Sequence, residues 1–262
     1  DVRARGTRLS AEVHSSLSAM AVLERQGPSV HHLSTIFLRK ALQAITKHLS
    51  SFPDITLTSD AKIYHMVTAY GKPSGETSVC PRDGELGCAY VDTLRGADNV
   101  GLANALLSYS WGYKVKDVVD ALVEWTRKEE RDPKRTYIWI CSLCLNQHRI
   151  IAVLTPDKLA KEFGERVLGI GRVLPMLEDW QNPGYVKRAW CLFELYTAIR
   201  MKSIHVDIIL TPSQSEQCAN AIKRDGFKSV DNALDTVKAE EAIATEHADL
   251  VAIQALIQRY QG

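Results

Sequence analysis

Two side chains near residue 190 are spaced so that they could act together. Trp190 and Glu194 are four positions apart, and residues at i and i+4 of an α-helix lie on the same face. An aromatic wall beside a carboxylate would raise the carboxylate pKa by excluding water, or would help to seat a planar ring. The ordinary alternative is a solvated glutamate, or one that pairs with the neighbouring cations Lys187 and Arg188.

The segment around this pair resembles the third conserved helix of TIR (Toll/interleukin-1 receptor-like) domains. In that family a tyrosine precedes a Trp-Cys-Leu-x-Glu-Leu run, and Tyr185 precedes the same run at Trp190 here. Ser108-Tyr-Ser-Trp-Gly112 likewise falls where the family has its first strand and the turn after it. The resemblance covers about residues 99–262.

The resemblance implies a specific chemistry. Many TIR domains cleave the nicotinamide–ribose bond of NAD with the glutamate that Glu194 matches. Loss of nicotinamide leaves an oxocarbenium-like ribose, and a fixed carboxylate can stabilise that charge. Many other TIR domains keep the fold for self-association alone. We therefore expect a protein-interaction, assembly or signalling subunit in which NAD binding can persist. The alternative is an NAD glycohydrolase, a hydrolase with Glu194 as its catalytic carboxylate, NAD as its substrate and no required cofactor.

Other residues would line the same site in a TIR fold. Ser110 and Trp111 belong to the segment of the first strand and the turn after it, while His148 and Arg149 enter the loop that borders the cleft in TIR domains. His148 and Arg149 could meet a phosphate there, or could belong to an ordinary polar turn. Together with Trp190, these four residues are the expected NAD-binding set.

The chain departs from the family pattern just before the Trp-Cys-Leu run. The small serines usual there are replaced by Lys187, Arg188 and Ala189, and the two cations could bind a pyrophosphate or block the cleft. The segments Tyr90-Val-Asp92 and Asn146-Gln-His148, taken with the others, look most like uncharacterised TIR-like proteins of algae and other protists. That pattern identifies no activity.

The cysteines and histidines do not predict a metal site. Cys141 and Cys144 are expected on a buried strand, where residues three apart point to opposite faces and cannot share an ion. Cys80 and Cys88 flank a turn-rich loop, and their spacing is compatible with a disulfide or with a reduced pair. The eight histidines show no chelating spacing. A third interpretation, a nucleotide-binding protein of another doubly wound family, would require a phosphate-binding glycine loop that the chain lacks.

From residue 104 onward, short apolar runs alternate with amphipathic helices. Strands are expected near 104–110, 136–144, 172–177 and 205–210. Helices are expected at 115–127, from 155 and at 186–201. This order predicts an α/β fold, a doubly wound parallel sheet of the flavodoxin-like kind that TIR domains adopt, with helices on both faces. An antiparallel sheet, or a helix across residues 136–145, would contradict it.

The first 98 residues are expected to form a helical extension with an irregular linker, and the TIR-like domain follows over residues 99–262. In these two parts, helices are predicted at 10–26, 32–50, 59–70 and 245–260, with a loop at 71–87. The apolar faces of the first helices need covering, so we expect them to pack on the domain or on a partner.

Composition limits the classes of partner. The chain is 45% hydrophobic and 24% charged, as in soluble globular proteins, and a net charge of +1 gives no case for nucleic acid. No apolar run approaches the ~18–20 residues that span a bilayer. We expect a soluble intracellular protein whose partners are other protein subunits or further copies of this chain. Its basic opening segment could be the remainder of an organelle-targeting region or a frayed tail, so the compartment stays unassigned.

Overall fold

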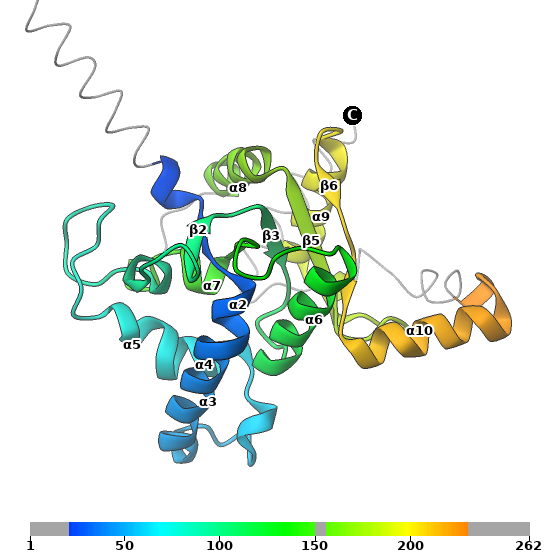
Figure 1. Ribbon diagram of the computed structural model, residues 1–262, viewed down its shortest axis with the longest axis horizontal. Helices are drawn as coiled ribbons and strands as arrows, with labels where there is room; N and C mark the ends of the chain where they lie inside the picture. Colours follow the sequence, from blue (N-terminus) through cyan, green and yellow to red (C-terminus); the bar gives the residue numbers. More distant parts are fainter. Residues whose placement is uncertain (1–20, 150–155, 230–262) are drawn as a thin grey trace, which may run out of the picture.

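The computed structural model describes residues 21–149 and 156–229 (Figure 1). Its main sheet consists of β3 (Ala105–Ser108), β4 (Ile138–Ile140), β5 (Arg172–Leu177), β6 (His205–Val206) and β7 (Ile209–Leu210). All its pairings are parallel, in the order β4-β3-β5-β6, with β7 also pairing with β5. The first strand of this sheet, β3, lies in its middle. The next strand, β4, lies at one edge, and the chain then crosses back over β3 to form β5 and β6 on the other side. This is the predicted doubly wound, flavodoxin-like α/β fold.

Strand β3 lies at the centre of the sheet because it is apolar along nearly its whole length. All four of its residues are buried, and Leu107 pairs with Ile140 on one side and with Leu174 on the other. Parallel strands that are covered on both faces need such continuous apolar runs. Ser108 is the exception, since it places a buried hydroxyl at the carboxyl end of the strand.

Two groups of helices cover the sheet. The main ones are α6 (Val115–Lys128), α8 (Pro156–Ile170), α9 (Ala189–Arg200) and α10 (Pro212–Asp225). Helices α8 and α9 contact each other and β3, whereas α6 contacts α10 and the N-terminal helices (Figure 1). The helices predicted at 115–127 and 186–201 are therefore present, with small shifts in their bounds. Their right-handed crossovers put α6 and α9 on different sides of the sheet.

The second predicted strand is wrong over its last part. Strand β4 ends at Ile140, and α7 (Cys141–Cys144) is a single helical turn. The strand stops because the β-branched and aromatic residues stop there, and Cys-Ser-Leu-Cys has little preference for an extended backbone. The turn is closed by the Leu145 N–H, which donates to the Cys141 carbonyl at 3.0 Å. The first strand likewise ends at Ser108 rather than at residue 110.

The described part of the N-terminal segment contains several helices. Helix α2 (Val30–His32) continues through the π-helical turn Leu33–Phe37 into α3 (Leu38–Lys47), where the sequence predicts a helix at 32–50. Helices α4 (Ile63–Met66) and α5 (Lys72–Gly75) follow, and α5 occupies the start of the region predicted as a loop. Of the helix predicted at 10–26, residues 10–20 lie outside the described residues, as does all of 245–260.

A short antiparallel ribbon joins the start of the described chain to the sheet. Its strands β1 (Gln26–Pro28) and β2 (Val100–Leu102) have no counterpart in the sequence-based prediction, which placed residue 26 in a helix. Gly27 allows β1 to approach β4 closely, because a Cβ at this position would lie 2.3 Å from the Ile138 carbonyl oxygen. The N-terminal segment therefore lies directly against the parallel sheet.

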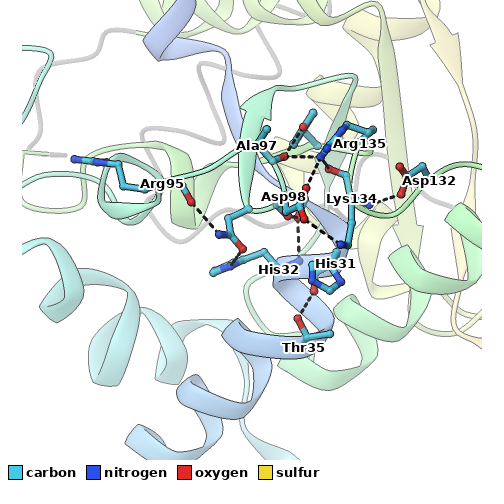
Figure 2. Close-up of polar contacts among 12 residues, drawn as sticks. His31, His32, Thr35, Arg95, Ala97, Asp98, Asp132, Lys134 and Arg135 are labelled. Atoms are coloured by element: carbon cyan, nitrogen blue, oxygen red, sulfur yellow. Dashed lines mark hydrogen bonds and ion pairs between the residues drawn. The ribbon is translucent and has the colours of Figure 1, made fainter.

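Polar contacts hold the N-terminal segment in place. The Ser29 hydroxyl donates to the Asp98 carbonyl at 2.6 Å. The Asp98 carboxylate forms ion pairs with Lys134 (3.0 Å) and Arg135 (2.8 Å), in the turn before β4 (Figure 2). The buried residues of the N-terminal helices and of the sheet belong to one hydrophobic core. Across the described ranges, no helix has the length and apolar character needed to cross a membrane.

Candidate functional site

A cavity of about 580 Å³ lies where β3 and β4 end, beside α8 and α9. Its volume falls within the range of small-molecule sites. Its place is also where doubly wound sheets bind their ligands, at the carboxyl ends of the strands. Most of the described walls of the cavity come from the turn after β3, the end of β4 with α7, and the two helices.

Trp190 and Glu194 both line this cavity from α9. They are one helical turn apart, so the face that the sequence predicts for them is the face that α9 presents to the cavity. Glu194 is half-buried, and among the described lining residues no other side chain is acidic. Cys191 and Phe193 lie between them and are buried, which anchors the helix on the sheet.

A chain of hydrogen bonds holds the Glu194 carboxylate. The Ser108 hydroxyl, at the carboxyl end of β3, bonds to Glu194 Oε2. Ser108 Oγ is also 2.6 Å from the hydroxyl oxygen of Tyr185, which in turn donates to the Cys191 carbonyl at 2.9 Å. Ser108 and Tyr185 are completely buried, so the carboxylate is fixed by the core rather than by surface groups.

The electrostatic setting of Glu194 departs from that of an ordinary glutamate. Burial raises the pKa of Glu194 to about 7, and the hydrogen bond from Ser108 opposes that rise. The group therefore exchanges between its neutral and ionised forms near neutral pH. A carboxyl group in this state can serve as an acid, as a base or as a fixed negative charge.

Aromatic side chains form much of the cavity wall. Trp111, Trp139 and Trp190 line it together with Phe163 and Phe193. The Trp190 and Phe193 rings meet edge to face, with centroids 6.2 Å apart and an interplanar angle of 89°. Such walls exclude water and accept planar rings of a ligand by stacking or edge contacts.

Two guanidinium groups bring positive charge to the same cavity. Arg166 comes from α8, and Arg188 is the N-cap residue of α9. Lys187, the other cation that departs from the TIR pattern, is exposed and does not belong to the described lining. Guanidinium groups bind phosphate oxygens with two parallel hydrogen bonds, so the cavity combines apolar walls with groups suited to a phosphate.

The N-terminal segment also contributes to the wall. Tyr64, in α4, lines the cavity, and its backbone N–H donates to the Trp111 carbonyl at 3.4 Å. Its hydroxyl donates to Asp54, which also accepts from His65 Nε2 at 2.8 Å. The part of the chain before residue 99 therefore shapes the site as well as the core.

Three predicted site residues lie outside the described lining. Ser110 is buried, and its hydroxyl accepts from the Gly112 N–H at 3.3 Å. Arg149 bonds to the Gly87 carbonyl and forms an ion pair with Asp83 at 3.0 Å.

His148, the third of these residues, has its Nε2 3.0 Å from the Lys72 carbonyl oxygen. His148 therefore contacts α5, and Arg149 contacts the loop before residue 88. The structure thus brings together Trp111, Trp190 and Glu194 of the predicted set.

The sequence offers a signal for some residues that the prediction omitted. Ser108 and Tyr185 are polar residues in otherwise apolar surroundings, and buried polar side chains normally have a hydrogen-bond partner. Their partner could not be named without the fold. Arg166 and Tyr64 carry no comparable signal, since a cation or tyrosine on an amphipathic helix is usually a surface residue.

The geometric reason given for excluding a metal at the Cys-Ser-Leu-Cys segment is wrong. Cys141 and Cys144 lie on one helical turn, not on a strand. Cys144 Sγ instead accepts from the Ile140 N–H at 3.3 Å, and the Trp111 Nε1–H points to Cys141 Sγ at 3.5 Å. No group of three or more potential metal ligands occurs within residues 21–149 and 156–229. Cys80 and Cys88 are buried free thiols.

The fold and the site define the class of this chain. It is an α/β protein with a flavodoxin-like sheet and an aromatic-walled cavity whose described lining contributes one carboxyl group and two guanidinium groups. No protein family, curated protein or solved structure matches the chain. The geometry of the cavity is therefore the basis for a functional proposal.

Proposed function

We propose that this chain is a TIR-like enzyme that hydrolyses the nicotinamide–ribose bond of NAD, with Glu194 as its catalytic carboxylate. The observation that carries the proposal is the position of Glu194, which lines an open cavity instead of lying under a closed surface. The aromatic walls suit the planar rings of a dinucleotide, and Arg166 and Arg188 suit its pyrophosphate.

The reaction assigns a simple task to Glu194. The bond between the nicotinamide nitrogen and ribose C1′ breaks, and its electron pair leaves with nicotinamide. The ribose is then an oxocarbenium ion, which the ionised carboxylate of Glu194 stabilises. Water adds to C1′ and loses a proton, so the products are ADP-ribose, nicotinamide and one proton. No electron is gained or lost, and no cofactor is needed.

The sequence alone favours an interaction role over NAD hydrolysis, whereas the cavity favours NAD hydrolysis. An interaction, assembly or signalling role stays a prediction, because no contact within the described chain tests it. The family assignment likewise rests on the resemblance at Tyr185 and at the Trp-Cys-Leu-Phe-Glu-Leu run. Two observations support it: the flavodoxin-like strand order, and the placement of Glu194 at the carboxyl end of the sheet.

The direct test is to incubate concentrated protein with NAD and to detect nicotinamide by chromatography. Glu194→Gln keeps the size of the side chain and its hydrogen bonding to Ser108 but removes the negative charge. We expect turnover to fall by about two orders of magnitude or more, as when one electrostatic stabiliser is lost. High concentration is needed because self-association is an expected property of the chain.

The matched control is Glu216→Gln, which removes a carboxylate from the exposed surface of α10. This variant should release nicotinamide at the wild-type rate. If the concentrated wild-type protein releases no nicotinamide, the enzymatic proposal is wrong and the assembly role becomes the better interpretation.

A further inference from the structure

The hydrogen-bond chain at Glu194 contains more contacts than its two hydroxyl groups can serve. There are three contacts: Glu194 with Ser108, Ser108 with Tyr185, and Tyr185 with the Cys191 carbonyl. Each hydroxyl group carries one proton. Burial raises the pKa of Tyr185 well above its ordinary value, so this phenol keeps its proton at any working pH.

The number of these three contacts that can be hydrogen bonds differs between the ionised and the neutral form of Glu194. When Glu194 is ionised, Ser108 donates to it, and Tyr185 can donate either to Ser108 or to the Cys191 carbonyl. One contact is then left without a proton. When Glu194 is neutral, it donates to Ser108, Ser108 donates to Tyr185, and Tyr185 donates to Cys191. All three contacts are hydrogen bonds in that form only.

We propose that Ser108 and Tyr185 are positioning residues that share one proton chain with Glu194, so that ionising the carboxyl group breaks one buried hydrogen bond. The inference rests on the proposed function only for its consequence, which is that this hydrogen-bond chain sets the pH at which the enzyme becomes active. The hydrogen-bond chain itself is a property of the folded protein.

The other ionisable groups around Glu194 do not supply this proton. Burial raises the pKa of the Cys141 thiol on α7 and of the Cys191 thiol on α9, so both stay neutral near pH 7. The Tyr109 hydroxyl after β3 is also kept neutral by burial, and it donates to Ser142 instead. Among the lining residues that the structure describes, the remaining ionisable groups are Tyr64 from α4, Arg166 from α8 and Arg188 from the N-cap of α9.

Replacing Tyr185 by phenylalanine gives a definite sign. In Tyr185→Phe the neutral form loses the bond from Ser108, whereas the ionised form keeps the bond from Ser108 to Glu194. The neutral form is thus weakened selectively, and the titration midpoint of Glu194 should move to lower pH. Tyr185 reaches Glu194 only through Ser108, so in the Ser108→Ala background the same replacement should leave the midpoint unchanged.

The experiment is a carbon-13 NMR titration of the glutamate carboxyl groups in four proteins: the wild type, both single variants and the double variant. Glu194→Gln identifies the resonance. Ser142→Ala is the matched control, because it removes a buried serine–tyrosine hydrogen bond of the same kind, from Tyr109 at 2.7 Å, without touching Glu194. It should leave the midpoint in place.

The outcomes separate this inference from the proposed function. A midpoint that falls in Tyr185→Phe and is unmoved by that change in the Ser108→Ala background supports the proton chain, whether or not NAD is cleaved. A midpoint that does not fall, or that falls equally in both backgrounds, overturns it.

If NAD is cleaved, the pH at half-maximal kcat/KM should follow the NMR midpoint. If Tyr185→Phe does not fold, Ser108→Thr, which keeps the hydroxyl, should retain the wild-type midpoint; a shifted one overturns the inference.

Discussion

The guanidinium group of Arg166 lies over the indole ring of Trp139, with its central carbon 4.7 Å from the ring centroid. Both side chains line the cavity, the arginine from α8 and the tryptophan from β4. A cation above an aromatic face is attracted by the ring quadrupole, which is negative at the face of the ring. The contact therefore fixes a flexible arginine at the wall where a phosphate would bind, before any ligand arrives.

This arrangement predicts the effect of removing the charge. Arg166→Gln should raise KM for NAD about tenfold, because a charge-assisted hydrogen bond to the pyrophosphate is lost. The turnover number should change little, since the arginine is remote from bond cleavage in the proposed reaction. Steady-state kinetics of nicotinamide release at constant ionic strength would measure both values.

The control is an arginine with the same geometry elsewhere. Arg131 lies over Trp125 at 4.8 Å, and it does not belong to the described lining of the cavity. Arg131→Gln should therefore leave KM unchanged. An equal rise in both variants would attribute the effect to net charge, and a fall in KM in Arg166→Gln would show that the guanidinium obstructs the cavity.

Much of the fold could be predicted because its signals are local. Helix α6 buries Val115, Val118, Val119 and Leu122, which stand at the i, i+3, i+4 and i+7 positions of one helical face. Turn α7 could not be predicted, because a four-residue turn after a buried strand has no periodicity of its own. The ribbon of β1 and β2 could not be predicted either, because its pairing joins residues far apart in the sequence.

The site could be predicted only where its residues are neighbours in the sequence. Trp190 and Glu194 share one helix, so their common face follows from their spacing. Ser108 and Glu194 are 86 residues apart, and only the packing of α9 on β3 brings them together. His148 and Arg149 were placed in the site by resemblance, but His148 contacts the Lys72 carbonyl of α5 and Arg149 contacts the Gly87 carbonyl, both in the segment before residue 99.

The close approach of β1 to β4 predicts an unusual sensitivity at Gly27. A Cβ there would meet backbone atoms of Ile138 at 2.3 Å, and backbone cannot rotate away as a side chain can. Gly27→Ala should therefore lower the free energy of unfolding by about 1–3 kcal/mol, the usual cost of overpacking. Urea denaturation followed by tryptophan fluorescence would measure it.

Gly164→Ala is the matched control for this change. Its Cβ would lie 3.2 Å from the end of the flexible Met201 side chain, inside α8. Since alanine has the higher helix propensity, this variant should be as stable as the wild type or more stable by roughly 0.5–1 kcal/mol. Equal losses in the two variants would show that the contact with Ile138 is not the cause.

The raised pKa of Glu194 makes a prediction about stability as well as activity. Its pKa is about 7 in the folded protein and 4.5 for an ordinary glutamate, so the folded state binds the proton more tightly. Between these two pH values the folded state carries more protons than the unfolded state, and the contribution of Glu194 to stability falls as pH rises. Above pH 7 the loss is complete, and it amounts to at most about 3 kcal/mol.

Glu194→Gln should therefore unfold at higher urea concentration than the wild type above about pH 7, and the difference should shrink toward about pH 5. Glutamine has no proton to lose, but it can still accept the hydrogen bond from Ser108. Denaturation curves of both proteins across this range would measure the difference, with Glu216→Gln as the exposed control that should show no such trend. If the difference in unfolding urea concentration between the two proteins stays constant with pH, the carboxyl group is not titrating in the folded state. A difference that grows toward neutral pH, together with the loss of NAD cleavage, would show that the charge required for catalysis destabilises the fold that holds it.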